Sequence, residues 1–161
     1  MPGLSPAREP QTVEILSSTP ANPEFGQGAA LFDDYRVHYG QQPDPDGSRR
    51  WLTAQIGSGR LTIAVAVRDE QVCGLITTMV QPASLRLGVA WAVRDLFVAP
   101  GARRGGIARA LLDHVIAEAR VAGALRVSLQ TEPENGPALA LYASLGFRPV
   151  DGLESLTLRL S

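Results

Sequence analysis

Apolar and polar residues recur along the chain with two periods, and these periods predict a series of strands and helices. Period-two alternation predicts strands over residues 13–16, 61–68, 72–80, 88–98, 125–131 and 156–160. Apolar residues at helical spacing predict helices over residues 25–39, 48–56, 107–122 and 137–145. Residues 1–11 are proline-rich and polar, so we expect a disordered tail followed by a single domain over residues 12–161.

The order of these elements predicts the class of fold. A short turn joins the strands over 61–68 and 72–80, which predicts a hairpin. Further along, the helix over 107–122 lies between two strands, as in a strand–helix–strand crossover. We therefore expect an α/β (α+β) fold with a mixed, mostly antiparallel sheet and helices on both faces.

The loop over residues 99–106 leads from a predicted strand into a predicted helix and has the features of an anion-binding site. A helix start offers unpaired backbone N–H groups and the positive end of the helix dipole. Gly105 and Gly106 carry no Cβ that would keep a phosphate away, and both can adopt positive φ angles. Three arginines in or beside the loop add positive charge: Arg103, Arg104 and Arg109. The sequence thus predicts a diphosphate-binding loop.

Every residue in the count of lysines and arginines is an arginine, and this excludes two classes of enzyme. A P-loop nucleotidase needs the lysine of its GK[ST] sequence, and a pyridoxal enzyme needs a lysine for its Schiff base. A dinucleotide-binding fingerprint also fits poorly, because Arg126 stands near the position where an acidic residue would bind the ribose.

The remaining composition narrows the partners and the compartment. A formal net charge of −1 without a basic stripe argues against nucleic acid or an anionic membrane as partner. No apolar run approaches the ~20 residues of a membrane span, and the first residues do not resemble a signal peptide, so we expect a cytoplasmic protein. Cys73, His38 and His114 are too far apart in sequence to form a metal-ligand motif, and we expect no metal.

Two motifs stand in the second half of the chain. The first, at residues 103–108, follows a strand that ends in LFVAP and fits the pattern [RQ]xxGx[GA]. The second lies in NGPALALYASLGF, and its matching residues are Asn135, Ala138, Leu141, Tyr142, Gly146 and Phe147. Together they resemble the GNAT superfamily of N-acetyltransferases over roughly residues 93–147. The resemblance implies a GNAT-like sheet of about six to seven strands with about four helices, splayed between the fourth and fifth strands.

The resemblance further implies that acetyl-CoA is the co-substrate and that the loop holds its diphosphate. The pantetheine arm would then lie along the splayed strand edge, where one backbone N–H would polarise the thioester carbonyl. The residues expected to bind acetyl-CoA are Leu96, Phe97, Val98, Arg103, Arg104, Gly105, Gly106, Ile107, Ala108, Arg109, Asn135 and Tyr142. For Asn135, a helix N-cap is an alternative and compatible role.

The expected chemistry is direct transfer in a ternary complex, because Cys73 lies mid-strand with no basic residue nearby to activate it as a nucleophile. By the resemblance, Tyr142 is the acid that protonates the departing thiolate, with a packing role as the alternative. Asp95 and Glu132 are candidate bases acting through water. Asp95 could instead be a buried carboxylate that orients a turn or pairs with an arginine, and Glu132 a solvated charge. Arg94 stands where related diamine acetyltransferases carry an acidic residue, which weakens a polyamine assignment.

In the GNAT superfamily the first two helices and their loop mainly set the choice of acceptor. In this chain we expect Asp33, Asp34, Tyr35 and Tyr39 to bind a small-molecule primary amine, such as an amino acid, an amine or an amino-bearing metabolite or antibiotic. An ordinary solvated helix face is the alternative for these acids. A peptide or protein amine, and a non-catalytic CoA-binding sensor, stay open as alternative functions. The superfamily also makes a homodimer one of the expectations.

Overall fold

The computed structural model describes residues 12–160. The chain divides into two compact units, Met1–Gln130 and Thr131–Ser161, and each is described by itself. The predicted tail over residues 1–11 lies outside the described residues.

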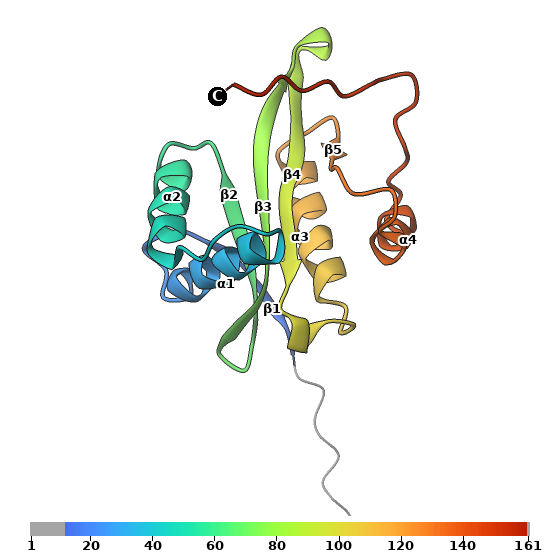
Figure 1. Cartoon of the computed structure of the whole chain (residues 1–161). Helices are drawn as coiled ribbons and strands as arrows, with labels where there is room; N and C mark the ends of the chain where they lie inside the picture. The colour runs from blue at the N-terminus through green and yellow to red at the C-terminus, as the bar shows by residue number, and fades with distance from the viewer. Residues whose placement is uncertain (1–11, 161) are drawn as a thin grey trace, which may run out of the picture. The chain divides into compact units, whose positions relative to one another are not determined.

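The first unit is built on one five-stranded sheet in the order β1-β2-β3-β4-β5 (Figure 1). Its strands are β1 (Glu14–Ser18), β2 (Thr62–Arg68), β3 (Gln71–Ala83), β4 (Gly88–Val98) and β5 (Val127–Ser128). Every neighbouring pair is antiparallel except β4 and β5, which are parallel. The mixed, mostly antiparallel sheet that we predicted is confirmed.

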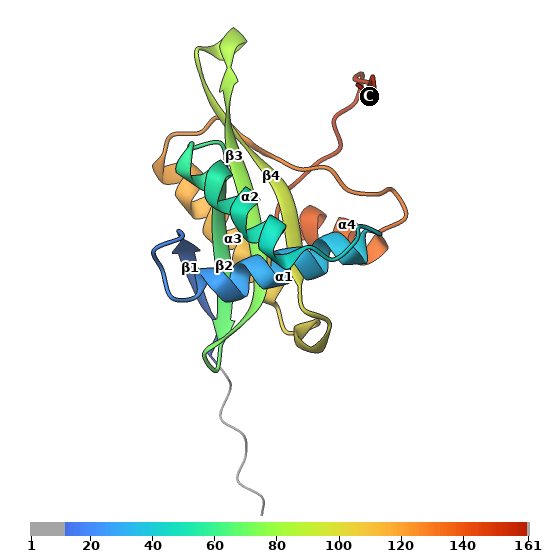
Figure 2. The ribbon, with the colours of Figure 1, turned by 60° about the vertical axis from the view of Figure 1, so that its left-hand side comes forward.

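Helices cover both faces of this sheet (Figure 2). Helices α1 (Phe25–His38) and α2 (Pro45–Gly57) lie on one face, and α3 (Ile107–Val121) lies on the other. Two short 3₁₀ turns, η1 (Ser84–Arg86) and η2 (Pro100–Ala102), flank β4. The second unit contains α4 (Gly136–Ser144). Four α-helices are thus present among the described residues, as the sequence led us to expect.

The two faces of the sheet are distinguished by alternate residues of β2 and β3. Val65 and Leu75 belong to the main core, which packs under α1 and α2. Gly74, on the opposite face, lies so close to α3 that a Cβ built on it would stand 2.8 Å from a methyl carbon of Ile107. A glycine here lets the start of α3 pack tightly on the sheet. The residues of the main core are Phe25, Ala29, Leu31, Phe32, Leu52, Leu61, Ile63, Val65, Leu75 and Phe97.

Helix α2 begins earlier than predicted. Its first turn starts at Pro45, and the Asp44 side chain accepts a hydrogen bond of 2.9 Å from the backbone N–H of Gly47. A proline at the first helical position and an aspartate N-cap favour a helix start, whereas the sequence analysis treated these residues as loop.

Two predicted strands differ in the structure. β5 is Val127–Ser128 instead of 125–131, because its partner β4 is paired with it only at Trp91 and Ala92. The prediction of a strand over residues 156–160 is wrong, since the described residues of the second unit form no strand. Period-two alternation shows which side chains share a face, but a strand also needs a partner for its backbone groups. The sheet therefore has five strands rather than six to seven.

Candidate functional site

The carboxyl-terminal half of β4 has one open edge. The register with β3 pairs Thr78 with Val93 and Thr77 with Asp95, so Arg94 is an extra residue in a β-bulge. On the other side, pairing with β5 ends at Ala92. Among the described residues, positions 93–98 consequently have no strand partner on the β5 side, which agrees with the splay implied by the family resemblance.

Strand geometry assigns the backbone groups along this edge. The N–H of Ala99 donates to the carbonyl of Cys73 on β3, at 2.9 Å. Because backbone groups of successive strand residues point to opposite sides, those of Val98 and Leu96 face the open edge, and those of Phe97 face β3. Of the three residues predicted to pair with pantetheine, Leu96 and Val98 thus have suitable backbone directions, whereas Phe97 offers its side chain.

Arg103 folds back onto the end of β4. Its Nε–H donates a 3.1 Å hydrogen bond to the carbonyl of Val98, and its guanidinium lies 5.5 Å from the centre of the Phe97 ring. The contact with the ring is a cation–π interaction. Arg103 therefore fixes the loop against the strand edge, and it uses one of the two Val98 backbone groups directed to that edge.

The loop that follows delivers backbone N–H groups at the start of α3. Arg104 has a φ of 63° and Gly106 a φ of 77°, and both are left-handed conformations. Gly106 is the N-cap of α3 and no side chain caps this helix end, so the first N–H groups of α3 have no capping acceptor. Left-handed residues on both sides of Gly105 help to turn successive N–H groups toward one concave side. This geometry suits a diphosphate.

The remaining residues predicted in the loop have distinct surroundings. The Ile107 side chain is buried against Gly74, and Ala108 is half-buried. Arg109 is the third residue of α3, with its Nε 4.0 Å from a carboxylate oxygen of Asp113. Both of these charged side chains are about half exposed.

Asp95 is held by two hydroxyl groups on the α1 face of the sheet. Thr77, which is fully buried, donates a short hydrogen bond to its carboxylate. Burial, the charge of Asp95 and a hydrogen bond to Asp95 raise the pKa of Tyr35 well above its usual range. The Tyr35 phenol therefore stays protonated at neutral pH and acts as a donor to Asp95.

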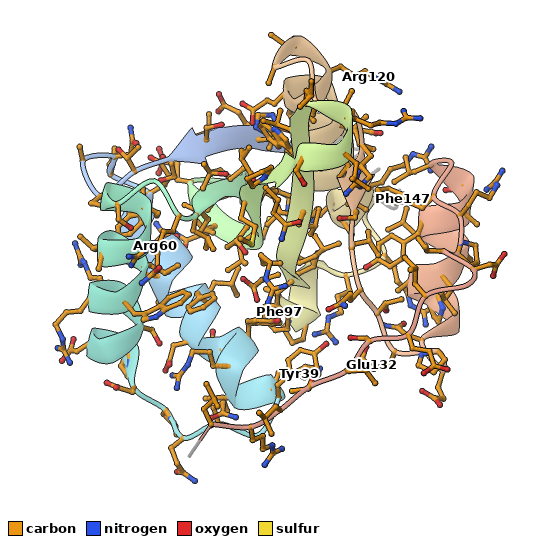
Figure 3. The ribbon with its side chains drawn as sticks, turned by 90° about the horizontal axis from the view of Figure 1, so that it is seen from above. Tyr39, Arg60, Phe97, Arg120, Glu132 and Phe147 are labelled. Carbon is orange, nitrogen blue, oxygen red and sulfur yellow. The ribbon has the colours of Figure 1, made fainter. Side chains whose placement is uncertain are left out.

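An aromatic cluster surrounds this carboxylate. The rings of Tyr35 and His38 lie 5.6 Å and 5.7 Å from that of Phe97, and the Tyr39 ring lies 5.1 Å from Tyr35 and 5.2 Å from His38. Figure 3 labels two members, Tyr39 at the end of α1 and Phe97 on β4. His38 and Thr77 were not predicted from the sequence as site residues. The signal for His38 was its helical spacing from Tyr35, at i+3.

The acids of α1 serve different purposes. Asp33 is buried and accepts hydrogen bonds from Arg36 at 2.6 Å, from the Ser48 hydroxyl at 2.7 Å and from the Asp44 backbone N–H at 3.1 Å. Burial alone would raise the pKa of Asp33, but these bonds and the Arg36 charge outweigh it and lower the pKa. Asp33 therefore joins α1 to the start of α2, while Asp34 is exposed. We keep Asp34 and leave Asp33 out of the proposed acceptor site.

Three predicted site residues belong to the second unit and are described within it. The Asn135 side chain caps α4 by accepting from the Ala138 N–H at 3.3 Å. The Tyr142 ring, on α4, is half-buried and lies edge-on to Phe147 with 6.0 Å between centroids. Glu132 is exposed and does not end β5 as predicted, because that strand stops at Ser128.

Within residues 12–160, no three His, Cys, Asp or Glu side chains gather into a group that could hold a metal ion. In the same range, none of the helices combines the length and apolar character needed to cross a bilayer.

An open strand edge beside an uncapped, glycine-started helix is the arrangement expected of an acyltransferase that takes a CoA thioester. Comparison with known proteins agrees. The model of the Acetyltransferase (GNAT) family matches residues 29–147, and the chain belongs to this family. It is an acetyltransferase-type enzyme, and the family uses acetyl-CoA as co-substrate.

Three curated relatives illustrate the range within the family. The chain is 31% identical over 124 residues to the uncharacterised N-acetyltransferase YhfO of Bacillus subtilis, covering 77% of this chain and 83% of that one. It is 34% identical over 125 residues to a mycothiol acetyltransferase of Beutenbergia cavernae, covering 77% of this chain but 36% of that longer protein. A [ribosomal protein bS18]-alanine N-acetyltransferase of Salmonella typhimurium is 29% identical over 139 residues, covering 84% and 80%.

A solved structure supports the fold. The crystal structure of a probable acetyltransferase superposes with a TM-score of 0.84 at 31% identity, covering 92% of this chain and 98% of that one.

Proposed function

We propose that this protein transfers the acetyl group of acetyl-CoA directly to a primary amine of a small molecule within a ternary complex. The observation that carries the proposal is the uncapped start of α3, at Gly106, beside the open edge of β4. In this proposal the N–H groups of that helix start hold the diphosphate, aided by Arg104 and Arg109. The N–H of Leu96 or Val98 stabilises the oxyanion that develops on the thioester carbonyl.

The bonds and protons of the transfer balance within this set of residues. The neutral amine attacks the thioester carbonyl, a C–N bond forms, and the C–S bond breaks. Tyr142 supplies the proton taken up by the departing thiolate. Glu132 remains a candidate base acting through water. Asp95 already accepts hydrogen bonds from Thr77 and Tyr35. We therefore propose that it orients neighbouring groups and does not act as the base.

The acceptor class follows from the cluster on α1 and β4. Aromatic rings beside a carboxylate favour a cationic or ring-bearing amine, which binds near Tyr35, Tyr39 and Asp34 and loses its proton before attack. A protein amine is the second candidate, because the Salmonella relative is an acetyltransferase of a ribosomal protein alanine.

The first test is thermal unfolding with excess acetyl-CoA, with NADH and ATP as controls. Ligand at about 100 times its Kd stabilises a protein by roughly 2.7 kcal/mol. A rise in Tm with acetyl-CoA alone supports the proposal, and no rise contradicts it. Release of CoA thiol with a panel of amines against a panel of peptides then separates the two acceptor classes. Tyr142→Phe should lose turnover while it keeps the acetyl-CoA shift.

Three coarser expectations complete the proposal. We infer that residues 12–161 unfold as one domain, which calorimetry tests through a single transition. We also propose a homodimer, tested by light scattering, and a cytoplasmic location, tested by cell fractionation.

A further inference from the structure

His38 has no role in the proposed function, although it lies in the aromatic cluster beside β4. It is the last residue of α1 and is exposed. Its imidazole packs against Phe97, with 5.7 Å between ring centroids and 46° between ring planes, and against Tyr39 almost edge-on. Phe97 stands between Leu96 and Val98, the two residues whose backbone groups face the open edge of β4. An exposed imidazole thus lies one ring away from the strand edge assigned to the thioester.

The other groups of this cluster are poorly suited to accept a proton from the acceptor. The Asp95 carboxylate is hydrogen-bonded by Thr77 and by Tyr35. The Tyr35 phenol is itself a protonated donor. For His38, by contrast, no hydrogen bond or ion pair is present among residues 12–160. Both of its ring nitrogens are therefore available to a substrate or a water molecule.

We propose that His38, in place of Glu132, accepts, directly or through one water molecule, the proton that the acceptor amine loses when it attacks the thioester. The proposal rests on the proposed function. In this step the amine forms its C–N bond, its N–H proton passes to an imidazole nitrogen, and the C–S bond breaks, with the departing CoA thiolate protonated as in the proposed function. Imidazole suits the step because it is the side chain whose unperturbed pKa lies nearest neutrality.

The charged and titratable groups around His38 come from three elements. On α1 they are Asp34, Tyr35 and Arg36, and Tyr39 directly follows the helix. On β4 they are Arg94, the extra residue of the bulge, and Asp95 beside it, and in the loop after β4 there is Arg103, which lies over Phe97. Protonation removes the lone pair that any general base needs, so the proposed step predicts an acid limb in the profile of rate against pH.

The test uses His38→Gln, which keeps a polar side chain but cannot titrate. General acid–base catalysis contributes about 10²- to 10⁴-fold, so kcat should fall by at least about 100-fold. The acetyl-CoA shift in Tm should be unchanged. The rate is measured against pH with the same amine for the wild type and the variant. The acid limb that we attribute to the base should be present in the wild type and absent from His38→Gln. His38→Ala should regain part of its rate with added imidazole.

The chain offers a matched control, since its only other histidine is His114. His114 lies on α3, on the opposite face of the sheet, with its Nε2 3.2 Å from Ser17 Oγ and 3.4 Å from Glu118 Oε1. His114→Gln should keep both the rate and the acid limb.

Each remaining outcome is decisive. A His38→Gln variant with kcat within about threefold of wild type, or one that is slower but keeps the acid limb, overturns the proposal. A wild-type protein with neither an acetyl-CoA shift nor turnover overturns the proposed function instead.

Discussion

The Thr77 hydroxyl on β3 donates a hydrogen bond to the Asp95 carboxylate on β4, at the residue where the register of the two strands shifts. Thr77 is fully buried, so this donor has no competition from solvent. Tyr35 reaches the same carboxylate from α1. Asp95 thus connects the bulge that opens the strand edge with the helix that carries the aromatic cluster.

Thr77→Val removes this donor and keeps the shape of the side chain. A hydrogen bond to a charged group contributes about 1.5–3 kcal/mol, so the free energy of unfolding should fall by about 2 kcal/mol. Urea denaturation measures the loss. Thr53→Val is the control, because the exposed Thr53 hydroxyl bonds only to the Arg49 carbonyl within α2. Equal stability of the two variants would show that the bond between Thr77 and Asp95 is unimportant.

Asp33 should make stability depend on pH below its ordinary pKa. Its folded-state pKa is lowered, so its contribution is complete above the unfolded pKa and is lost as pH falls through the folded value. Asp33→Asn breaks a buried ion pair and should cost about 3 kcal/mol at pH 7. The loss should shrink as pH falls below the ordinary pKa of an aspartate, because the unfolded wild-type chain then binds a proton that the folded chain does not. Asp34→Asn, one residue along and exposed, should change stability by less than about 0.5 kcal/mol.

Chemical unfolding at pH 7 and at pH 3 checks this prediction. A cost of Asp33→Asn that is equal at both pH values would contradict the lowered pKa. A cost no larger than that of Asp34→Asn would contradict the structural role of Asp33.

Gly74→Ala tests the close packing of α3 on β3. A Cβ at this position would lie 2.8 Å from Ile107 and 3.2 Å from Leu111, both buried, so α3 must shift. Overpacking of this kind costs about 1–3 kcal/mol, and the Tm should fall accordingly. Since Ile107 opens α3, KM for acetyl-CoA should rise as well. Gly57→Ala is the control: nothing lies within 4 Å of the added Cβ at the end of α2, and it should be neutral or stabilising.

Elements could be predicted from the sequence where the hydrophobic pattern is long and the contacting residues are close together in the chain. β4 and α3 have strong periodicity, and their observed starts at Gly88 and Ile107 match the predicted ones. Glycines and arginines in the loop could likewise be recognised, because a strand–loop–helix junction is a local arrangement. The buried residues of α3 include Leu111, Leu112, Val115 and Ala119, which recur at helical spacing.

Other features depend on contacts between segments that are distant in the sequence. The bulge at Arg94 is a property of the β3–β4 register, and no single-strand pattern reveals it. From the sequence, Asp33 has the pattern of a surface acid. In the structure the turn between α1 and α2 places the Ser48 hydroxyl and the Asp44 backbone N–H within hydrogen-bond distance of its carboxylate. His38 was considered only as a metal ligand, and its ring contact with Phe97 was not predictable from spacing.

Gly106→Ala separates the conformation of the loop from its packing. The φ of Gly106 is +77°, and nothing lies within 4 Å of an added Cβ, so the substitution introduces strain without a clash. Left-handed backbone costs an L-residue about 1–2 kcal/mol, and the loop can relieve this strain by turning its N–H groups away from the ligand. We expect KM for acetyl-CoA to rise about tenfold, with a smaller change in kcat. Gly101→Ala, which is equally uncrowded but has no positive φ, should leave KM unchanged. Steady-state kinetics in acetyl-CoA measures both, and equal KM values would show that the left-handed turn at Gly106 does not organise the diphosphate site.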